Sequence, residues 1–499
     1  MEALQNLLKE IHLLKTTQSA LSWDQETQLP DGAIDFRSEQ LSYLSKLEHE
    51  KLTSSQFSAI LSEFVDLETG FVNSKLSEKE QRFLQCIYKD WKKASSLPQS
   101  FVIRYSKLCS KAQHVWQKAR EQQAFHEFSP YLEELVQLSK EKAAYIDSTK
   151  KPYDVLLDTY EEDLNSDFLT PIFKELRLSI VNLISKLKQS SAQFYDLTKH
   201  QYDKDKQWQF GIDVLERMGY NFHCGRQDIS THPFTIDISP FDVRITTRVD
   251  EFNLMEALSS SIHEGGHGLY EQGLNTETLG SPFSEALSLG FHESQSRLWE
   301  KVIGQSMPFW TYFYPKLQAL FPQLSDCSLS DFYASINEVK PGFIRVESDE
   351  LTYNLHILIR YEIEQALFND NISVKSLPEL WNAKMKDYLG LDVKNDSQGV
   401  LQDVHWSCGL FGYFPTYTLG NLYSTMLFDQ IKKDIPELET LISKGNFLVI
   451  KNWCQDNVYC HGRLYTPKQL IKRITGSSLS CNSFVSYLNR KYSEIYQFQ

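Results

Sequence analysis

The segment His263-Glu264-Gly265-Gly266-His267 constrains this chain more than any other feature of its sequence. On an α-helix the two histidines lie one turn apart on one face, where both imidazoles can bind the same zinc ion. Glu264 then projects beside the metal, where a general base must lie to take a proton from a water molecule. The segment therefore predicts a helix that carries two metal ligands and a catalytic base.

The composition limits the kinds of partner that the chain can have. Of the 499 residues, 41% are hydrophobic and 23% are charged, and the net charge of −14 disfavours nucleic acid or an anionic membrane as the main partner. No apolar run approaches the roughly 20 residues of a membrane span, and the first residues do not form a signal peptide. The eight cysteines are scattered and form no C-x-x-C pair, which predicts a location in the reducing cytoplasm.

Apolar residues at helical spacing dominate the chain. Such spacing places the apolar residues from Leu4 to Leu14 on one face, and it recurs over residues 36–62, 78–120, 130–150 and 168–197. We find no internal repeat and no long linker, although the polar stretch from Lys199 to Trp208 could mark a seam between subdomains. The pattern predicts a mainly helical fold.

Two short segments just before the metal motif break the helical pattern. Residues 234–238 and 242–247 alternate and are rich in β-branched side chains, and Ser239-Pro240-Phe241 separates them. This pattern predicts two strands, plausibly a hairpin, beside the metal helix. A strand in that place offers backbone donors and acceptors to an extended peptide, although a purely structural sheet would have the same sequence pattern.

A catalytic zinc site usually has three protein ligands, so the two histidines need a third. A following helix that packs against the first could bring Glu285, His292 or Glu293 to the metal, and the residues alone do not choose among them. Glu271 lies on the ligand face one turn beyond His267, where it could support a ligand. The glycines of the motif lower its helix propensity, which predicts a close neighbour at that point.

Several blocks of residues are spread over nearly the whole chain: Trp23-Asp24-Gln25-Glu26-Thr27 with Leu29-Pro30 and Arg37, His232-Pro233-Phe234, residues 242–247, residues 263–267, His292-Glu293-Ser294-Gln295, residues 344–349 and residues 399–406. In their sequence and their order these blocks resemble the M32 metallocarboxypeptidases, the family of the thermostable bacterial carboxypeptidases. Two positions depart from the family pattern: Leu29 replaces the usual Met, and Ser348 replaces the usual Ala.

The resemblance implies that Glu293 is the third zinc ligand and that Glu264 is the general base. It implies removal of single residues from peptide C-termini, with a broad preference that disfavours acidic and some Pro-adjacent ends, and activity with zinc or cobalt. It also implies a homodimer and a mostly helical fold with a deep groove. We expect one continuous domain, in which helices of about residues 1–200 wall the groove and about residues 201–499 form the catalytic part.

A carboxypeptidase must recognise a free carboxylate, for which a bidentate arginine is well suited. Arg345 and Arg244 both lie in matched blocks, and we favour Arg345 as the carboxylate clamp with Arg244 as its rival. Either arginine could instead form a structural ion pair, Arg345 with Glu347 or Asp349, and Arg244 with Asp242.

The tetrahedral intermediate needs a donor besides the metal. His405 lies in a matched block, and a His-then-Tyr arrangement in related helical zinc peptidases favours Tyr417 over Tyr413 as its partner. His232 could contact substrate or support the pocket, although Pro233 makes a simple turn equally consistent.

Two other functions use the same residues. An endo-oligopeptidase would share the zinc chemistry, but the two arginines argue against it, and a C-terminally amidated peptide would distinguish the two activities. A helical peptide-binding scaffold could keep zinc for stability alone. Glu264 argues against the scaffold, because a structural zinc site does not use a base and normally closes its fourth position.

Overall fold

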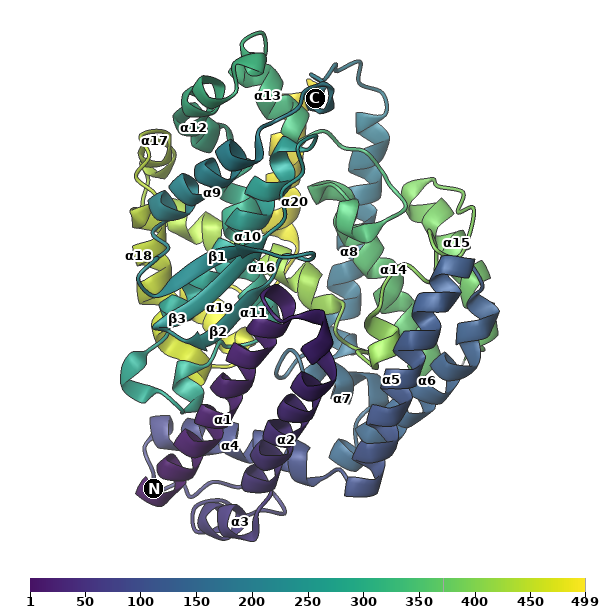
Figure 1. The fold of residues 1–499 in the computed structure, drawn as a ribbon, viewed down its shortest axis with the longest axis vertical. Helices are drawn as coiled ribbons and strands as arrows, with labels where there is room; N and C mark the ends of the chain where they lie inside the picture. The colour runs from purple at the N-terminus through teal and green to yellow at the C-terminus, as the bar shows by residue number, and fades with distance from the viewer. Residues whose placement is uncertain (371, 499) are drawn as a thin grey trace. The chain divides into compact units, whose positions relative to one another are not determined.

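Helices make up most of the part of the chain that the structure, a computed structural model, describes, which is residues 1–370 and 372–498 (Figure 1). The predicted mainly helical fold is therefore confirmed. Among the described residues, no helix combines the length and the apolar character needed to cross a membrane.

The chain divides into two compact units that are built from interleaved segments. Unit 1 consists of Met1–Ser95, Phe194–Ile336 and Ser424–Ser478, and unit 2 consists of Ser96–Gln193, Asn337–Tyr423 and Leu479–Gln499. A boundary at Gln193 lies just before the polar stretch that begins at Lys199. The expectation of one continuous domain, with a groove wall over about residues 1–200 and a catalytic part over about 201–499, stays a prediction.

Unit 1 holds the metal motif, a small sheet and most of the shorter helices. Helix α16 (Pro415–Asp434) begins in unit 2 and ends in unit 1. The other helices of unit 1 are α1 (Glu2–Thr27), α2 (Ile34–Leu52), α3 (Ser55–Ser62), α4 (Glu78–Ser95), α9 (Lys204–Met218), α10 (Leu254–Gln272), α11 (Leu289–Arg297), α12 (Met307–Leu320), α13 (Leu329–Ile336), α17 (Leu438–Ser443), α18 (Leu448–Asn457) and α19 (Pro467–Thr475).

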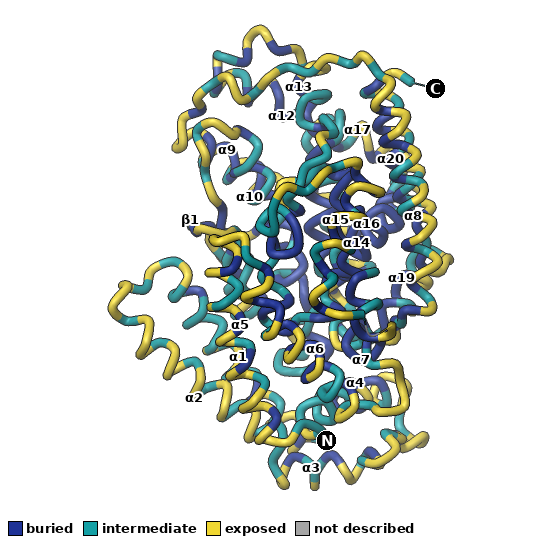
Figure 2. Tube along the Cα trace, turned by 90° about the vertical axis from the view of Figure 1, so that its right-hand side faces the viewer, coloured by how far each residue is buried: buried dark blue, intermediate teal, exposed yellow. Residues whose placement is uncertain are grey.

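Unit 2 contains longer helices, of which α14 (Glu350–Phe368) is the most deeply buried. Nearly all of its residues are buried, and its trace is dark blue in Figure 2, whereas α2 of unit 1 has no buried residue. Asp349 caps α14 by accepting hydrogen bonds from the backbone N–H groups of Leu351 and Thr352. The other helices of unit 2 are α5 (Gln99–Gln122), α6 (Phe125–Asp147), α7 (Pro152–Asp158), α8 (Ser166–Leu187), α15 (Leu377–Leu389) and α20 (Asn482–Tyr496).

The N-terminal helix of unit 1 has the apolar face that the sequence predicts. Leu4 and Ile11 of α1 are buried against a cluster that includes Phe57 of α3 and Leu84 of α4. Burial of each such side chain contributes about 1.5–3 kcal/mol before the entropy cost of ordering the chain. This core fixes the start of α1 in unit 1.

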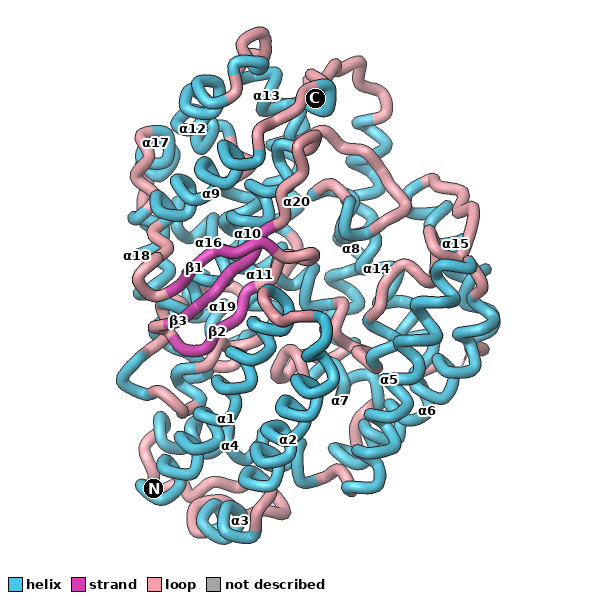
Figure 3. The backbone as a smooth tube through the Cα atoms, viewed as in Figure 1, coloured by secondary structure: helices cyan, strands magenta, loops and turns pink. Residues whose placement is uncertain are grey.

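The two predicted strands form part of a three-stranded sheet in unit 1. Strand β2 (Thr235–Ser239) pairs antiparallel with β3 (Asp242–Thr247), which confirms both strands and the hairpin. A further strand, β1 (Gly225–Ile229), pairs parallel with β3, so the order is β1-β3-β2, and Figure 3 shows the sheet beside α10. The sequence analysis missed β1 because Arg226 and Asp228 give it little β character.

Helical spacing overestimated the length of some helices. The stretch 168–197 is α-helical only to Leu187, and just beyond it Ser190 donates a hydrogen bond to the carbonyl of Tyr496 and accepts one from the N–H of Ala192. The stretch 36–62 contains α2 and α3, and the stretch 78–120 contains α4 and α5, which begins after Pro98. Apolar spacing predicts helical faces more reliably than it predicts where helices end.

Candidate metal centre and arginine cluster

Helix α10 presents His263 and His267 on one face, as the motif predicts. The Nε2 atoms of His263 and His267 lie 3.8 and 3.6 Å from the Oε2 atom of Glu293, and the ligand atoms of all three residues lie within 4.8 Å of one another. We call these three residues the His–Glu cluster. Of the three residues that the sequence left open, Glu293 is the one that the structure brings to the two histidines.

Close packing of two helices makes this approach possible. A Cβ atom at Gly266 of α10 would lie 2.7 Å from both the carbonyl oxygen of Gln295 and the Cα atom of Ser296 in α11. Any side chain at this position would therefore push α11 away and move Glu293 with it. The close neighbour that the glycines predicted is the backbone of the helix that carries Glu293.

Glu293 is oriented by residues of its own helix. Ser288 caps α11 by accepting a hydrogen bond from the N–H of Phe291, which starts the helix at a fixed residue. One turn after Glu293, the Nε atom of Arg297 donates to Glu293 Oε1 over 2.6 Å. Because Arg297 holds Oε1, the other carboxylate oxygen faces the histidines.

Glu300 orients His263 from the opposite side of the imidazole. The Nδ1 atom of His263 lies 2.8 Å from Glu300 Oε2, and Lys301 lies 2.8 Å from Glu300 Oε1. Glu300 belongs to a π-helical turn, Leu298–Ile303, that continues from α11. A carboxylate on Nδ1 leaves Nε2 of His263 available as a ligand, which is the usual support of a metal-binding histidine.

The electrostatics of the His–Glu cluster suit a cation. Burial would lower the pKa of His263, but Glu293 and Glu300 outweigh it and raise that pKa above its usual value. Burial and the neighbouring imidazoles hold the pKa of His267 well below its usual value. Two imidazole nitrogens and one carboxylate oxygen are a donor set that zinc prefers, so the residues fit the metal that the sequence predicts.

Glu264 lies next to the cluster and is almost fully buried. Its Oε2 atom accepts a hydrogen bond of 2.6 Å from the hydroxyl of Thr235, the first residue of β2. Burial raises the pKa of the Glu264 carboxyl, although His263 and Thr235 oppose that effect. A carboxylate with increased proton affinity is suited to accept a proton from water.

The other acidic and histidine candidates have different partners. Glu285 accepts a hydrogen bond of 2.7 Å from Arg463, and His292 pairs with Glu271 over 2.7 Å. The His292 ring stacks on His267, with ring centroids 4.3 Å apart. Glu271 therefore supports the cluster through His292 and does not contact a ligand histidine in any hydrogen bond that the described residues show.

In unit 2, Arg345 lies in a buried ion pair. Its Nε and one terminal nitrogen donate to Asp403 over 3.1 and 2.8 Å, and its other terminal nitrogen donates to the hydroxyl of Tyr353. Arg360 of α14 donates to the second oxygen of Asp403 over 2.6 Å. We call Arg345, Arg360 and Asp403 the Asp403 cluster. The acidic partner of Arg345 is thus Asp403, not Glu347 or Asp349.

The predicted donors of unit 2 gather around this cluster. His405 Nε2 and the Tyr417 hydroxyl are 3.4 Å apart, and the Tyr417 ring centroid lies 5.0 Å from the guanidinium carbon of Arg345. Tyr413 packs against His405, with centroids 5.5 Å apart. Burial and the two arginines lower the pKa of His405 to about 4, so its imidazole is neutral at physiological pH.

Arg244 and His232 lie in unit 1, beside the sheet. Arg244 donates two hydrogen bonds to Asp242, over 2.8 and 2.7 Å. This is the structural ion pair that the sequence offered as the alternative to a carboxylate clamp. The guanidinium of Arg244 also lies over the ring of Trp23. His232 is exposed, and its carbonyl accepts a hydrogen bond from the hydroxyl of Ser230. The loop of His232 is therefore fixed by its backbone, while its imidazole faces solvent.

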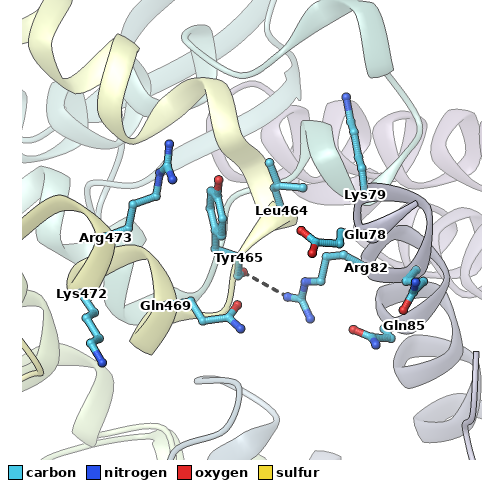
Figure 4. A pocket seen from close by; sticks show the side chains of 10 residues that line it. Glu78, Lys79, Arg82, Gln85, Leu464, Tyr465, Gln469, Lys472 and Arg473 are labelled. Atoms are coloured by element: carbon cyan, nitrogen blue, oxygen red, sulfur yellow. Dashed lines mark hydrogen bonds between the residues drawn. The ribbon is translucent and has the colours of Figure 1, made fainter. Parts of the chain in front are cut away.

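Unit 1 has a hollow of about 750 Å³ between α4 and α19, away from the metal motif (Figure 4). Arg82 lies within it and donates to the carbonyl of Tyr465 over 3.1 Å. The cationic side chains of Lys79, Lys472 and Arg473 point in different directions in the figure. These lining cations do not converge on one point, as they would around a bound anion.

Several supporting residues were not predicted from the sequence, among them Arg297, Glu300, Thr235 and Arg360. Glu300 follows Glu293 by two helical turns, so spacing along one face was a signal for it. Thr235 directly follows His232-Pro233-Phe234, but nothing in its sequence pattern distinguishes it from an ordinary strand threonine. Arg360 lies within α14, and the sequence of this helix gives no sign of its partner. Only the position of Asp403 in the structure shows that Arg360 forms part of the Asp403 cluster.

The chain is similar to known proteins over nearly its whole length. Residues 3–492 match the model of the family described as Carboxypeptidase Taq (M32) metallopeptidase. The chain is 39% identical over 494 residues to Carboxypeptidase 1 of Bacillus subtilis, covering 98% of this chain and 97% of that protein. It is 37% identical to Thermostable carboxypeptidase 1 of Thermus thermophilus, covering 99% of each. The crystal structure of an M32 carboxypeptidase from Deinococcus radiodurans R1 is similar with a TM-score of 0.96 at 35% identity, covering 100% of this chain and 99% of that one.

Proposed function

This chain belongs to the Carboxypeptidase Taq (M32) metallopeptidase family and is a metallocarboxypeptidase, and from that premise we propose that it is a zinc enzyme of broad specificity. In this proposal it removes single residues from the C-termini of peptides and disfavours acidic and some Pro-adjacent ends. Cobalt can substitute for zinc.

The observation that carries the proposal is the convergence of His263, His267 and Glu293, with Glu264 beside them. These three residues would hold the metal ion through two Nε2 atoms and one carboxylate oxygen. A bound zinc ion polarises the scissile carbonyl and makes a water molecule more acidic. Arg297 and Glu300 would keep Glu293 and His263 in the orientations that this binding needs.

Glu264 is the general base in this mechanism. Its buried carboxylate accepts a proton from the attacking water and passes it to the nitrogen of the leaving amine. Its raised pKa, caused mainly by burial, supports this role because the carboxylate then holds the proton more readily between the two transfers.

Arg345 is the proposed clamp for the substrate carboxylate, with Arg244 as the alternative. The contacts of Arg345 with Asp403 and Tyr353 use three of the five N–H bonds of its guanidinium, so donors remain for a substrate. Two arginines share one carboxylate in the Asp403 cluster, which leaves one positive charge in excess. Replacing the true clamp should abolish discrimination between free and amidated C-termini without changing the metal content.

Tyr417 and His405 are the proposed donors to the oxyanion, and Tyr413 and His232 are proposed to contact the substrate. The closeness of the Tyr417 hydroxyl to His405 supports a shared role, because a neutral imidazole can orient a phenol through a hydrogen bond. Normal turnover by a Tyr417→Phe variant would remove Tyr417 from the mechanism.

The remaining proposals concern the state of the protein in the cell. Its resemblance to the family supports a homodimer, which light scattering coupled to size-exclusion chromatography would test. The scattered cysteines, all free among the described residues, support a cytoplasmic location.

The experiment that tests the function is mass spectrometry of a mixed peptide pool incubated with zinc- or cobalt-loaded protein, with and without a chelator. Stepwise loss of C-terminal residues that the chelator stops is the expected result. Internal cuts would indicate an endo-oligopeptidase, and intact peptides with both metals would indicate a zinc-stabilised peptide-binding scaffold.

A further inference from the structure

One hydroxyl group contacts the carboxylate of Glu264. The Thr235 hydroxyl lies 2.6 Å from Glu264 Oε2 and 3.1 Å from the backbone carbonyl of the same residue. A hydroxyl has a single proton, and the shorter distance is typical of an O–H group that donates to an ionised carboxylate. Thr235 therefore holds one particular oxygen of Glu264.

Thr235 itself is fixed by the sheet. It pairs with Ile245 across the β2–β3 ladder. The preceding residue, Phe234, donates its N–H to the hydroxyl of Thr246 over 2.9 Å, and Thr246 donates its own N–H to the carbonyl of Phe234 over 2.9 Å. Because Thr246 is fully buried, this double contact leaves the backbone beside Thr235 little freedom.

The same contacts explain why the strands and the metal helix must lie side by side. The hydroxyl of Thr235 reaches both the backbone and the side chain of Glu264, so it joins β2 to α10 at the residue that follows His263. With Oε2 occupied by Thr235, Oε1 is the oxygen that remains for proton transfer. A carboxylate that turned only partway about its last bond would break the hydrogen bond to Thr235 and move the other oxygen out of this direction.

We propose that Thr235 is a positioning residue for Glu264, which holds the general base in the rotamer that directs Oε1 toward the attacking water. This inference rests on the proposed role of Glu264 and extends it to a residue outside the metal motif. The block of residues 242–247 supplies Thr246, which fixes the strand that carries Thr235. This block and the metal motif at residues 263–267 then act together through the contact of Thr235 with Glu264.

The test compares Thr235→Val with Thr235→Ser in the metal-loaded enzyme. Valine keeps the shape and the β-branched character of threonine but removes the hydroxyl, whereas serine keeps the hydroxyl. We expect Thr235→Val to lower kcat at least about tenfold, a fraction of the 10²–10⁴-fold that a positioned base contributes. KM and metal content should not change, and Thr235→Ser should restore most of kcat.

A matched control is Thr475→Val on α19, where the hydroxyl donates only to backbone carbonyls. This variant should keep the wild-type kcat. Adding Thr235→Val to Glu264→Gln should lower the residual rate no further, because the base that Thr235 positions is already absent.

The outcomes separate this inference from the proposed function. Full turnover by Glu264→Gln would overturn the proposed role of Glu264 as general base and the inference together, although the carboxypeptidase function would stand. An inactive Glu264→Gln protein beside a Thr235→Val protein with normal kcat would overturn the inference alone. Loss of metal or of thermal stability in Thr235→Val would also overturn it, because the hydroxyl would then be structural.

Discussion

In unit 1, the carboxylates of Glu264, Glu293 and Glu300 lie around His263, whereas in unit 2 two arginines share the carboxylate of Asp403. Both regions bury charged groups, which is costly unless the charges are balanced. Around His263 these three carboxylates outnumber the two cations that pair with them, Arg297 on Glu293 and Lys301 on Glu300, so a bound metal cation would offset the remaining negative charge. In the Asp403 cluster the one carboxylate offsets only part of the charge of the two arginines, which leaves one positive charge in excess.

This difference separates two ways in which a buried site is stabilised. The His–Glu cluster has the donor set of a metal site, so changes around it should first affect metal affinity and turnover. The Asp403 cluster depends on its internal ion pairs, so changes there should affect folding first. The following variants test that separation.

The largest expected effect is that of Glu264→Gln on turnover. Glutamine keeps the shape of the side chain but cannot accept the proton, so kcat should fall about 10²–10⁴-fold. Metal content, measured by atomic absorption, should equal that of the wild type because Glu264 is not one of the three proposed ligands. Loss of metal together with activity would place Glu264 among the groups that hold the ion.

Asp403→Asn should reduce the free energy of unfolding by about 3–5 kcal/mol, because a neutral amide leaves two buried arginines without their counter-charge. Urea denaturation followed by circular dichroism measures this loss. The control is Asp392→Asn, which breaks an exposed ion pair with Lys386 and should change stability little. Equal stability of the two variants would contradict the view that Asp403 balances its cluster.

Glu364 of α14 tests a second buried carboxyl of unit 2. It accepts hydrogen bonds from Trp406, Tyr153 and the N–H of Gly412, yet burial raises its pKa from 4.5 to about 7. The folded state therefore keeps a proton that the unfolded state releases. The resulting stabilisation is full below pH 4.5, falls as the pH rises, and is lost above about pH 7.

Glu364→Gln should remove this pH dependence. The quantity to compare is the free energy of unfolding of the wild type minus that of the variant. This difference should be larger at pH 5 than at pH 8 by up to roughly 3 kcal/mol, which corresponds to the gap between the folded and unfolded pKa values of Glu364. A constant difference between the two proteins from pH 5 to 8 would show that Glu364 is ionised throughout.

The smallest expected effect is that of Glu300→Gln on metal affinity. The amide supports the Nδ1 atom of His263 less well, so metal affinity should fall about 10–100-fold, as measured by competition with a chromogenic chelator. Glu256→Gln on α10 is the control, since Glu256 pairs with Arg248 and not with a ligand. If both variants bind metal equally, Glu300 does not orient His263.

The sequence by itself determined the helical character of the chain, the two strands β2 and β3, and the pairing of His263 with His267 on one helix. Each of these follows from local spacing, because periodicity along a short segment decides which side chains share a face. The resemblance to a known family added Glu293, and the structure brings that residue to the two histidines.

Only the tertiary structure decided which distant groups support these residues. Thr235 reaches Glu264 because β2 packs beside α10, and Asp403 lies between Arg345 and Arg360 because a loop and a helix meet there. Likewise, Ser190, three residues beyond the end of α8 at Leu187, donates a hydrogen bond to the carbonyl of Tyr496 in the C-terminal helix. Such contacts join residues far apart in the chain, so no local pattern of apolar or polar residues encodes them.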